Sequence, residues 1–164
     1  MGTKNGKTEQ VSGENFYMKL LKAATSDGIN RFSVGAVISK GKKVLLFRRE
    51  KNDFLGGIYE IPGGGIEEGE TLVDCIKREI KEETGLSVKN VIGYVGSFDY
   101  SSENGGKTRQ FNFTVTVRSP LVIHLSTEHD DYKWVTQEDF HRINPTKEMV
   151  EILGNFWKGG NCTT

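Results

Sequence analysis

The sequence has few cysteines, few prolines and no long apolar segment. Among its 164 residues are only two cysteines, Cys75 and Cys162, and three prolines. Two distant cysteines without a CxxC or Cys/His cluster argue against a disulfide framework and a cysteine-based zinc site, and favour a reducing compartment. No stretch approaches the length of a membrane span, and the polar N-terminal segment does not resemble a signal peptide. We therefore expect a cytoplasmic protein.

The sequence also lacks an excess of either charge. Its 22 Lys and Arg residues balance 22 Asp and Glu residues, and the sequence pI is about 6.8. Proteins that bind bulk nucleic acid or acidic membranes usually carry a strong basic excess, so we expect neither partner. The charges are unevenly placed, however, because acids concentrate in residues 64–86 and bases in residues 40–51. This division suits a small anionic ligand that is held together with a cation.

The hydrophobic content is that of one globular domain. Apolar residues make up 35% of the chain, which is enough for a core at this length. We assign residues 29–158 to a mixed α/β domain, residues 1–28 to a polar leader with a short amphipathic helix, and residues 159–164 to a flexible tail. The leading helix is predicted from apolar residues at helical spacing, with Ser12 as a candidate N-cap.

Two periodicities divide the domain into strands and helices. Apolar alternation between turn residues predicts strands, and apolar spacing of three and four with capping residues predicts helices. In residues 107–117 the alternation places Phe111 and Phe113 on one face and Asn112 and Thr114 on the other. The predicted strands are residues 31–39, 43–49, 59–61, 88–100, 107–117 and 133–135, and the predicted helices of the domain are residues 71–84 and 146–157.

The predicted helix at residues 71–84 carries three glutamates, Glu79, Glu82 and Glu83, at spacings i, i+3 and i+4, so their carboxylates project to one side. A solvated charged face would be the ordinary explanation. A turn of about 100° per residue, however, puts Glu79 and Glu83 within roughly 20° of the apolar face and Glu82 on the same half. The lysines fall on the opposite face, and Arg78 reaches at most the edge of the group. We therefore expect all three glutamates to face the body of the protein.

Inward carboxylates of like charge require a cation. Burial of unpaired carboxylates is costly, and closely spaced oxygen ligands fit Mg²⁺ or Mn²⁺ better than zinc. The glycine run at residues 63–65 lets the backbone come close to an ion or a ligand. We therefore predict a divalent metal site between this run and the helix at residues 71–84.

The same region resembles the 23-residue motif of the Nudix hydrolases, G-x5-E-x7-R-E-U-x-E-E-x-G-U, in which U is an apolar residue. The preceding residues 57–64 are similar to the lead-in of that family, with Tyr59 where Trp is more usual. The resemblance extends over residues 30–157. Every fixed position of the motif is matched, by Gly64, Glu70, Arg78, Glu79, Ile80, Glu82, Glu83, Gly85 and Leu86.

This resemblance implies a fold and a metal ion. The fold would be the Nudix α/β fold, a mixed β-sheet sandwiched between helices, and the predicted order of strands and helices is compatible with it. The carboxylates of Glu79, Glu82 and Glu83, together with the carbonyl of Gly64, would hold Mg²⁺, with Mn²⁺ as a substitute.

The resemblance also implies roles for individual residues. Glu70 and Arg78 would brace the loop against the helix, outside the ligand shell. As the group that orients or deprotonates the attacking water, Glu79 is our first choice. An acid of the loop at residues 128–131, with Glu128 first, is the alternative base or further metal ligand.

The activity implied by the resemblance is hydrolysis of a phosphoanhydride in a nucleoside diphosphate linked to another group, which releases a nucleoside monophosphate. Arg48 and Arg49 are candidates to bind phosphate, and Tyr59 is a candidate to contact the base. Residues 101–103 match neither the pattern of ADP-ribose hydrolases nor that of dinucleoside polyphosphate hydrolases. A nucleoside triphosphate or modified nucleotide is therefore the leading substrate, with ADP-ribose, nucleotide sugars and dinucleoside polyphosphates as alternatives.

Two other classes stay open. A nucleotide-binding regulatory module without turnover is one, although the intact glutamates argue against it. An isoprenoid diphosphate isomerase is the other, although that relative needs a catalytic cysteine outside the helix, whereas Cys75 lies within it. The oligomeric state is open, and a homodimer is one candidate.

Overall fold

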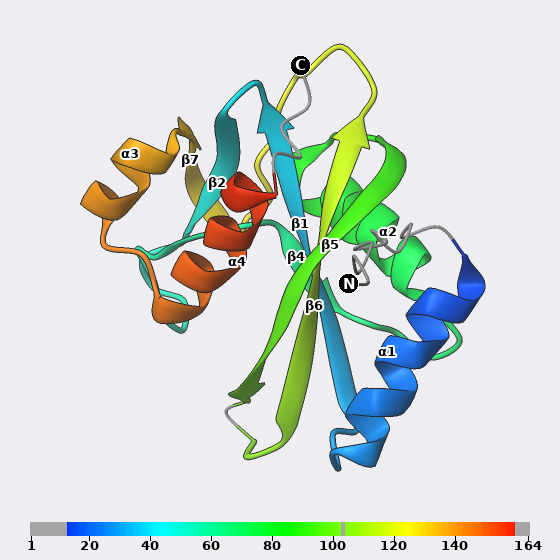
Figure 1. Cartoon of the computed structure of the whole chain (residues 1–164). Coiled ribbons are helices and arrows are strands. Elements are labelled where there is room, and N and C mark those ends of the chain that lie inside the picture. The colour runs from blue at the N-terminus through cyan, green and yellow to red at the C-terminus, as the bar shows by residue number, and fades with distance from the viewer. Residues whose placement is uncertain (1–12, 103, 160–164) are drawn as a thin grey trace, which may run out of the picture.

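The computed structural model describes residues 13–102 and 104–159 (Figure 1). Ser12, Cys162 and all but the first residue of the predicted tail lie outside these residues. All the predicted strands and helices are present, and the structure adds β4 and the short helices α3 and η1. None of the helices formed by the described residues is long and apolar enough to cross a membrane. In chain order the elements are α1 (Glu14–Ser26), β1 (Arg31–Lys40), β2 (Lys43–Arg49), β3 (Tyr59–Glu60), β4 (Gly63–Gly65), α2 (Leu72–Thr84), β5 (Val88–Ser101), β6 (Lys107–Val117), β7 (His129–Val135), α3 (Gln137–Phe140), η1 (His141–Ile143) and α4 (Lys147–Lys158).

The strand β1 organises the sheet. It runs parallel to β6 and antiparallel to β4, with Val34 opposite Gly64. Its pairing with β2 is confined to the hairpin end, where Ser39 and Lys40 face Val44 and Lys43. The strand β2 pairs with β7 from Val44 to Arg49, and beyond the hairpin end it pairs with β3 instead of β1. The strands β1 and β2 therefore share a turn and then take different partners.

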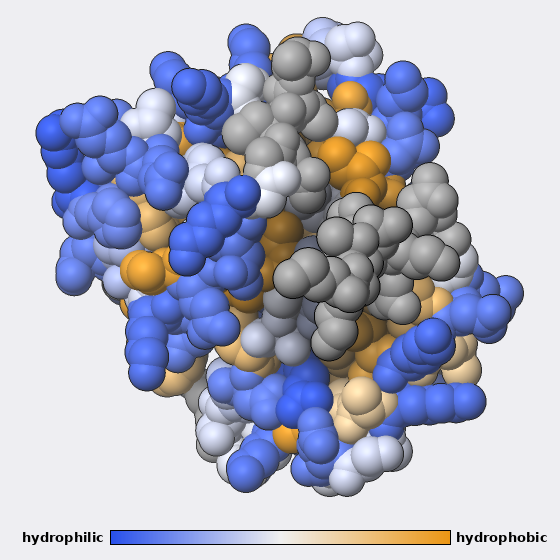
Figure 2. All heavy atoms as spheres, viewed as in Figure 1, coloured by the Kyte–Doolittle hydropathy of each residue, from blue (hydrophilic) through white to orange (hydrophobic). Residues whose placement is uncertain are grey.

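Helices cover both sides of this mixed sheet. The first core cluster contains residues of α2, such as Ile76 and Ile80, packed with β1 and β6. The second contains residues of α4, such as Ile152 and Phe156, packed with β2 and β3. Figure 1 shows α2 and α4 on opposite sides of the sheet, and Figure 2 shows hydrophilic residues over most of the outer rim of the same view. The predicted fold, a mixed sheet sandwiched between helices, is confirmed.

The strand β6 alternates as predicted, but both of its faces are buried. Phe111 and Phe113 are at most 1% exposed, as the alternation favours, and Asn112 and Thr114 on the other face are fully buried as well. The Asn112 side-chain amide donates to the Gly96 carbonyl at 3.2 Å and accepts from the Gln110 amide at 2.8 Å. Burial of Asn112 is offset by these hydrogen bonds, whereas the buried Thr114 hydroxyl has no hydrogen-bond partner among the described residues.

The helix α2 begins and ends where its capping residues favour. The Thr71 hydroxyl accepts a hydrogen bond from the Asp74 N–H at 3.1 Å, which satisfies one of the free amides of the first turn. Gly85 has a φ of 73° in the left-handed region, which stops the helix without the strain that a side chain would add. These two ends fix the position of the intervening glutamates relative to β4.

Candidate active site

The three glutamates of α2 differ in burial. Glu83 is only 5% exposed, and the Glu79 side chain is 13% exposed. The Glu82 side chain is 60% exposed, so the expectation that all three face inward is wrong for this residue. Its position on the helix is at the border of the buried face, about 80° from Leu72 on the side away from Ile76 and Ile80, and a long side chain at a border turns toward solvent.

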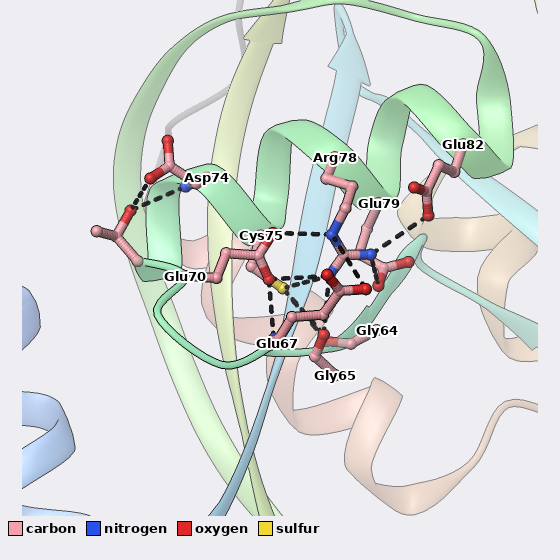
Figure 3. A network of polar contacts seen from close by, with 10 residues as sticks. Gly64, Gly65, Glu67, Glu70, Asp74, Cys75, Arg78, Glu79 and Glu82 are labelled. Atoms are coloured by element: carbon pink, nitrogen blue, oxygen red, sulfur yellow. Dashed lines mark hydrogen bonds and ion pairs between the residues drawn. The ribbon is translucent and has the colours of Figure 1, made fainter.

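Arg78 reaches further than the helical position predicted. Its guanidinium donates to both oxygens of Glu70, at 2.8 and 2.9 Å, and to the Gly65 carbonyl at 3.0 Å. It also contacts Glu79 at 2.6 Å and Glu82 at 3.3 Å, so that it lies among three carboxylates (Figure 3). The prediction that Arg78 meets only the edge of the group is therefore wrong, because a direction on a helical wheel ignores the length of the side chain.

The predicted contact between Glu70 and Arg78 joins the loop to the helix. Glu70 also accepts the Glu67 N–H at 3.0 Å, so that one carboxylate connects the turn after β4 with α2. The hydrogen bonds from Arg78 are the main cause that lowers the pKa of Glu70 to about 2. Glu70 therefore stays ionised at any ordinary pH, and the brace keeps its charge.

Glycine is required where the backbone meets these carboxylates. A Cβ at Gly64 would overlap the Glu79 carboxylate, and a Cβ at Gly63 would overlap the carbonyl oxygen of Val34. The Gly63 N–H donates to Glu83 at 2.8 Å. The absence of side chains at the glycine run therefore brings the backbone into direct contact with two of the glutamates.

Burial makes the glutamate charges costly. It is the main cause that raises the pKa of Glu83 to about 8, and Glu79, Glu60 and Glu128 add repulsion, while the Gly63 N–H opposes the shift. Burial also raises the pKa of Glu79, against the effect of Arg78. Such a site gains from an added positive charge.

The donor chemistry of this site fits a hard divalent cation. The available ligands are carboxylate oxygens and the backbone carbonyls of the glycine run, which Mg²⁺ prefers to nitrogen or sulfur. Within the described part of the chain no three acidic, His or Cys side chains already form a ligand group. Arg78 lies between Glu79 and Glu82 instead, so a bound ion would take over contacts that the guanidinium now makes.

A cavity of about 510 Å³ opens beside these carboxylates. Acids gather at one end, where Glu60, Glu83 and Glu128 line the wall with Arg49. Phe54 and Leu55 are each 56% exposed and line the same cavity. Its remaining lining is mixed, with Ile58, Ile61, Gly63, Gly64, Phe98, Met149, Tyr100, Ser33, Ser101, Gln110, Thr146 and Glu148. The cavity thus combines a charged end with apolar and hydrogen-bonding surfaces.

Arg49 reaches this cavity, whereas Arg48 and Tyr59 do not occur among the described residues that line it. Successive side chains of a strand point to opposite faces, and Arg48 is the register partner of Tyr59 on β3. Arg48 donates to Asp130 at 2.6 Å, and the Tyr59 hydroxyl donates to Asp131 at 2.7 Å. Of the predicted substrate-binding residues, only Arg49 is brought to the acidic end.

The sequence interpretation missed Glu60. Its carboxylate accepts from Arg49 at 3.2 Å and lies 3.2 Å from Nε2 of the buried His129. Arg49 is also paired with Asp53, which holds the loop after β2 near the cavity. The sequence position of Glu60 could have indicated a role at the site, because this residue lies on the short strand directly before the glycine run.

Comparisons with known proteins identify relatives of this chain. The family model described as NUDIX domain matches residues 29–155. An ADP-ribose pyrophosphatase of Methanocaldococcus jannaschii is 45% identical over 69 residues, which are 41% of this chain and 40% of that protein. An NAD-capped RNA hydrolase NudC of Vibrio parahaemolyticus is 30% identical over 116 residues, which are 71% of this chain and 42% of that protein.

A solved structure supports the fold. The solution structure of the Escherichia coli ORF135 protein superimposes with a TM-score of 0.68 at 21% identity, over 82% of this chain and 94% of that chain. The chain spans less than half the length of the two relatives above, 40% and 42%. The match of the family model covers most of the chain, and the chain therefore belongs to the Nudix family.

Proposed function

We propose that this Nudix domain hydrolyses a phosphoanhydride bond in a nucleoside diphosphate linked to another group and releases a nucleoside monophosphate. The observation that carries the proposal is the contact of Glu79 and Glu83 with the backbone of Gly63 and Gly64 at the charged end of a cavity. A volume of about 510 Å³ is of the size that holds a nucleotide-sized ligand.

The carboxylates of Glu79, Glu82 and Glu83 with the Gly64 carbonyl would hold the divalent ion, with Mg²⁺ favoured over Mn²⁺. When bound, the ion neutralises phosphate oxygens and lowers the pKa of the attacking water. Orientation and deprotonation of the water depend on side chains of the protein. Glu79 orients the water and accepts its proton, and Glu128, which lines the cavity with Glu83, is the second candidate for this role.

Other residues position the substrate. Arg49 lies at the acidic end, where it can face a phosphate oxygen, and the brace between Glu70 and Arg78 keeps the glycine run against α2. The exposed side chains of Phe54 and Leu55 offer an apolar wall for a nucleobase. This arrangement separates the reacting phosphates from the group that gives the substrate its identity.

A nucleoside triphosphate or a modified nucleotide is the leading substrate of the proposal. The relatives named above are described as acting on ADP-ribose and on NAD-capped RNA, so both belong in the same screen. Cys75 is a poor candidate for the catalytic cysteine that the isomerase alternative needs. Burial is the main cause that raises the pKa of its thiol to about 12, so the reactive thiolate hardly forms at neutral pH.

A Mg²⁺-dependent screen tests the proposal. It uses nucleoside triphosphates, oxidised nucleotides, nucleotide sugars, ADP-ribose, dinucleoside polyphosphates and capped RNA, and measures the nucleoside monophosphate released. We expect Glu79→Gln and Glu82→Gln to lower kcat by about a hundredfold or more. Glu68→Gln removes an equal charge from an exposed position that makes no ion pair with the other described residues, and should keep activity.

Two outcomes would count against the proposal. Equal rates for wild type and Glu82→Gln would remove this residue from the metal site. If no substrate is cleaved with either Mg²⁺ or Mn²⁺ while nucleotides still bind, the regulatory module without turnover becomes the better explanation.

A further inference from the structure

A second cavity, of about 400 Å³, lies at the hairpin end of β1 and β2. Its lining residues are Lys40, Lys42, Lys43, Trp134 and Thr136. Within the described part of the chain it shares no lining residue with the larger cavity. Six positions of β1 separate Lys40 from the partner of Gly64, which is about 20 Å along a strand. This cavity therefore stands apart from the carboxylates of α2.

Positive charge is concentrated there, and the other described residues do not compensate it. Lys40, Lys42 and Lys43 are all exposed, and none of them makes an ion pair with another described residue. Lys40 and Lys43 are direct register partners on the hairpin, an arrangement of like charges that lowers the stability of a strand pair. No carboxylate occurs among the described residues of the lining. The cavity thus offers three ammonium groups to an anion.

An aromatic ring stands beside the lysines. Trp134 is half-buried, pairs with Leu45 across β2 and β7, and packs against the first core cluster. The indole N–H of Trp134 has no hydrogen-bond partner among the described residues. The ring is thus packed against the core and also lines the cavity together with the three lysines.

The fold holds these groups in place. The Trp157 indole of α4 donates to the Lys42 carbonyl at 3.2 Å, which fixes the turn of the hairpin. Thr136 caps α3 by accepting the Asp139 N–H at 3.2 Å, and Asp139 in turn faces Arg142 at 3.1 Å. Asp139 is therefore already paired, and the backbone of the hairpin turn and the start of α3 are both held by hydrogen bonds.

We propose that this second cavity binds single-stranded nucleic acid, with one base stacked on Trp134 and the flanking phosphates on the three lysines. A flat aromatic ring next to a short row of cations is the combination that binds single strands without reading their sequence. Inorganic polyphosphate would use the lysines alone. The balanced charge of the chain argued against binding of bulk nucleic acid, but the balance is an average and does not exclude a few local contacts.

The test is a direct binding assay, so its result does not depend on whether the proposed hydrolysis is correct. The full chain is titrated into a fluorescein-labelled single-stranded RNA of about twelve nucleotides, and fluorescence polarisation reports the Kd. For Lys40→Gln/Lys42→Gln/Lys43→Gln we expect the Kd to rise by about tenfold or more at moderate salt. The slope of log K against log salt should fall by about 2, since each phosphate contact on a single strand contributes roughly 0.7.

A matched control separates a local site from general charge. Lys19→Gln/Lys22→Gln/Lys89→Gln removes the same charge from exposed positions on α1 and β5, and its Kd should stay within about twofold of wild type. If the control loses as much affinity as the hairpin variant, or if the hairpin variant binds as tightly as wild type, the proposal is wrong. Because the hairpin variant relieves a like-charge pair, its melting temperature should not fall.

The aromatic part has its own test. Trp134→Leu keeps an apolar side chain against the core and removes the stacking surface, and it should weaken binding of the strand by about five- to a hundredfold. Wild type should bind an abasic strand of the same length more weakly by a similar factor, and Trp134→Leu should not distinguish the two strands. If wild type binds both strands equally, the cavity holds phosphate only and the stacked base is refuted.

Discussion

Ionisation of Glu83 should make the metal-free protein less stable as the pH rises. Its pKa is raised from 4.5 to about 8 in the folded chain, mainly by burial. A folded-state pKa above the unfolded value means that the folded state holds the proton more tightly. The resulting stabilisation is complete below about pH 4.5 and is lost as the pH passes through 8.

The size of this effect follows from the shift. Between these two values the free energy of unfolding should fall by about 1.4 kcal/mol per pH unit, or about 4 kcal/mol by pH 8. Glu83 is only 5% exposed, so solvent screens the effect little. Against a typical domain stability of about 5–15 kcal/mol, the loss should be easy to measure.

Glu83→Gln provides the matched comparison, because its amide imitates the protonated acid and its oxygen can still accept the Gly63 N–H. The assay is urea unfolding in the presence of a chelator at pH 5.5, 6.5 and 7.5. We expect the stability of the variant to depend on pH less steeply than that of wild type, and the variant to be the more stable protein at pH 7.5. Equal slopes, or a variant less stable than wild type at pH 7.5, would refute the assignment of a buried, poorly compensated carboxylate.

Addition of Mg²⁺ should reverse the order of the two proteins. An ion that binds only the folded wild type stabilises it by about 2.7 kcal/mol at a hundred times its Kd, and Glu83→Gln should gain much less. If Mg²⁺ stabilises both proteins equally, Glu83 does not take part in metal binding, although the pH result could still hold.

Three further changes test other parts of the site. Gly64→Ala should lower activity strongly, because the new Cβ would overlap the Glu79 carboxylate. Gly65→Ala should retain activity, because a Cβ at that position has no atom within 4 Å. The measurement is the rate of hydrolysis of each variant at saturating Mg²⁺. Arg49→Gln should raise the KM for substrate by about tenfold, as expected for loss of a charged hydrogen bond, while Arg48→Gln, on the opposite face of β2, should leave KM unchanged. Thr71→Ala should cost about 1 kcal/mol of unfolding free energy with kcat per folded molecule unaffected, and a large change in kcat would mean that the cap also positions the glutamates.

Local sequence patterns predicted the helix of the site well. Thr71 and Gly85 mark the two ends of α2 because each satisfies a backbone requirement that few other residues meet. The spacing of the glutamates and the glycine run likewise led to the place where carboxylates meet the backbone. These features depend on residues close together in the chain, and short-range geometry determines them.

Contacts between distant or long side chains were not predictable in the same way. The reach of Arg78 to Glu79 and the exposure of Glu82 depend on side-chain torsions, which a helical wheel does not contain. The place of Arg48 depends on which strand lies beside β2, and that partner, β7, comes more than eighty residues later. The sequence pattern showed a basic stretch but not how the sheet would divide it between two faces.

That division links both proposed sites to one feature of the sheet. Where β1 and β2 are paired, at Ser39 to Val44, the basic stretch is folded back on itself and its lysines gather at the turn. Where they have separate partners, β4 lies on β1 and β3 lies on β2, and Arg49 reaches the cavity beside the glutamates. In these two proposals, cations that are neighbours in the chain act at two sites that lie about 20 Å apart. A change in the hairpin lysines should therefore alter binding of a long ligand without altering the hydrolysis of a short one.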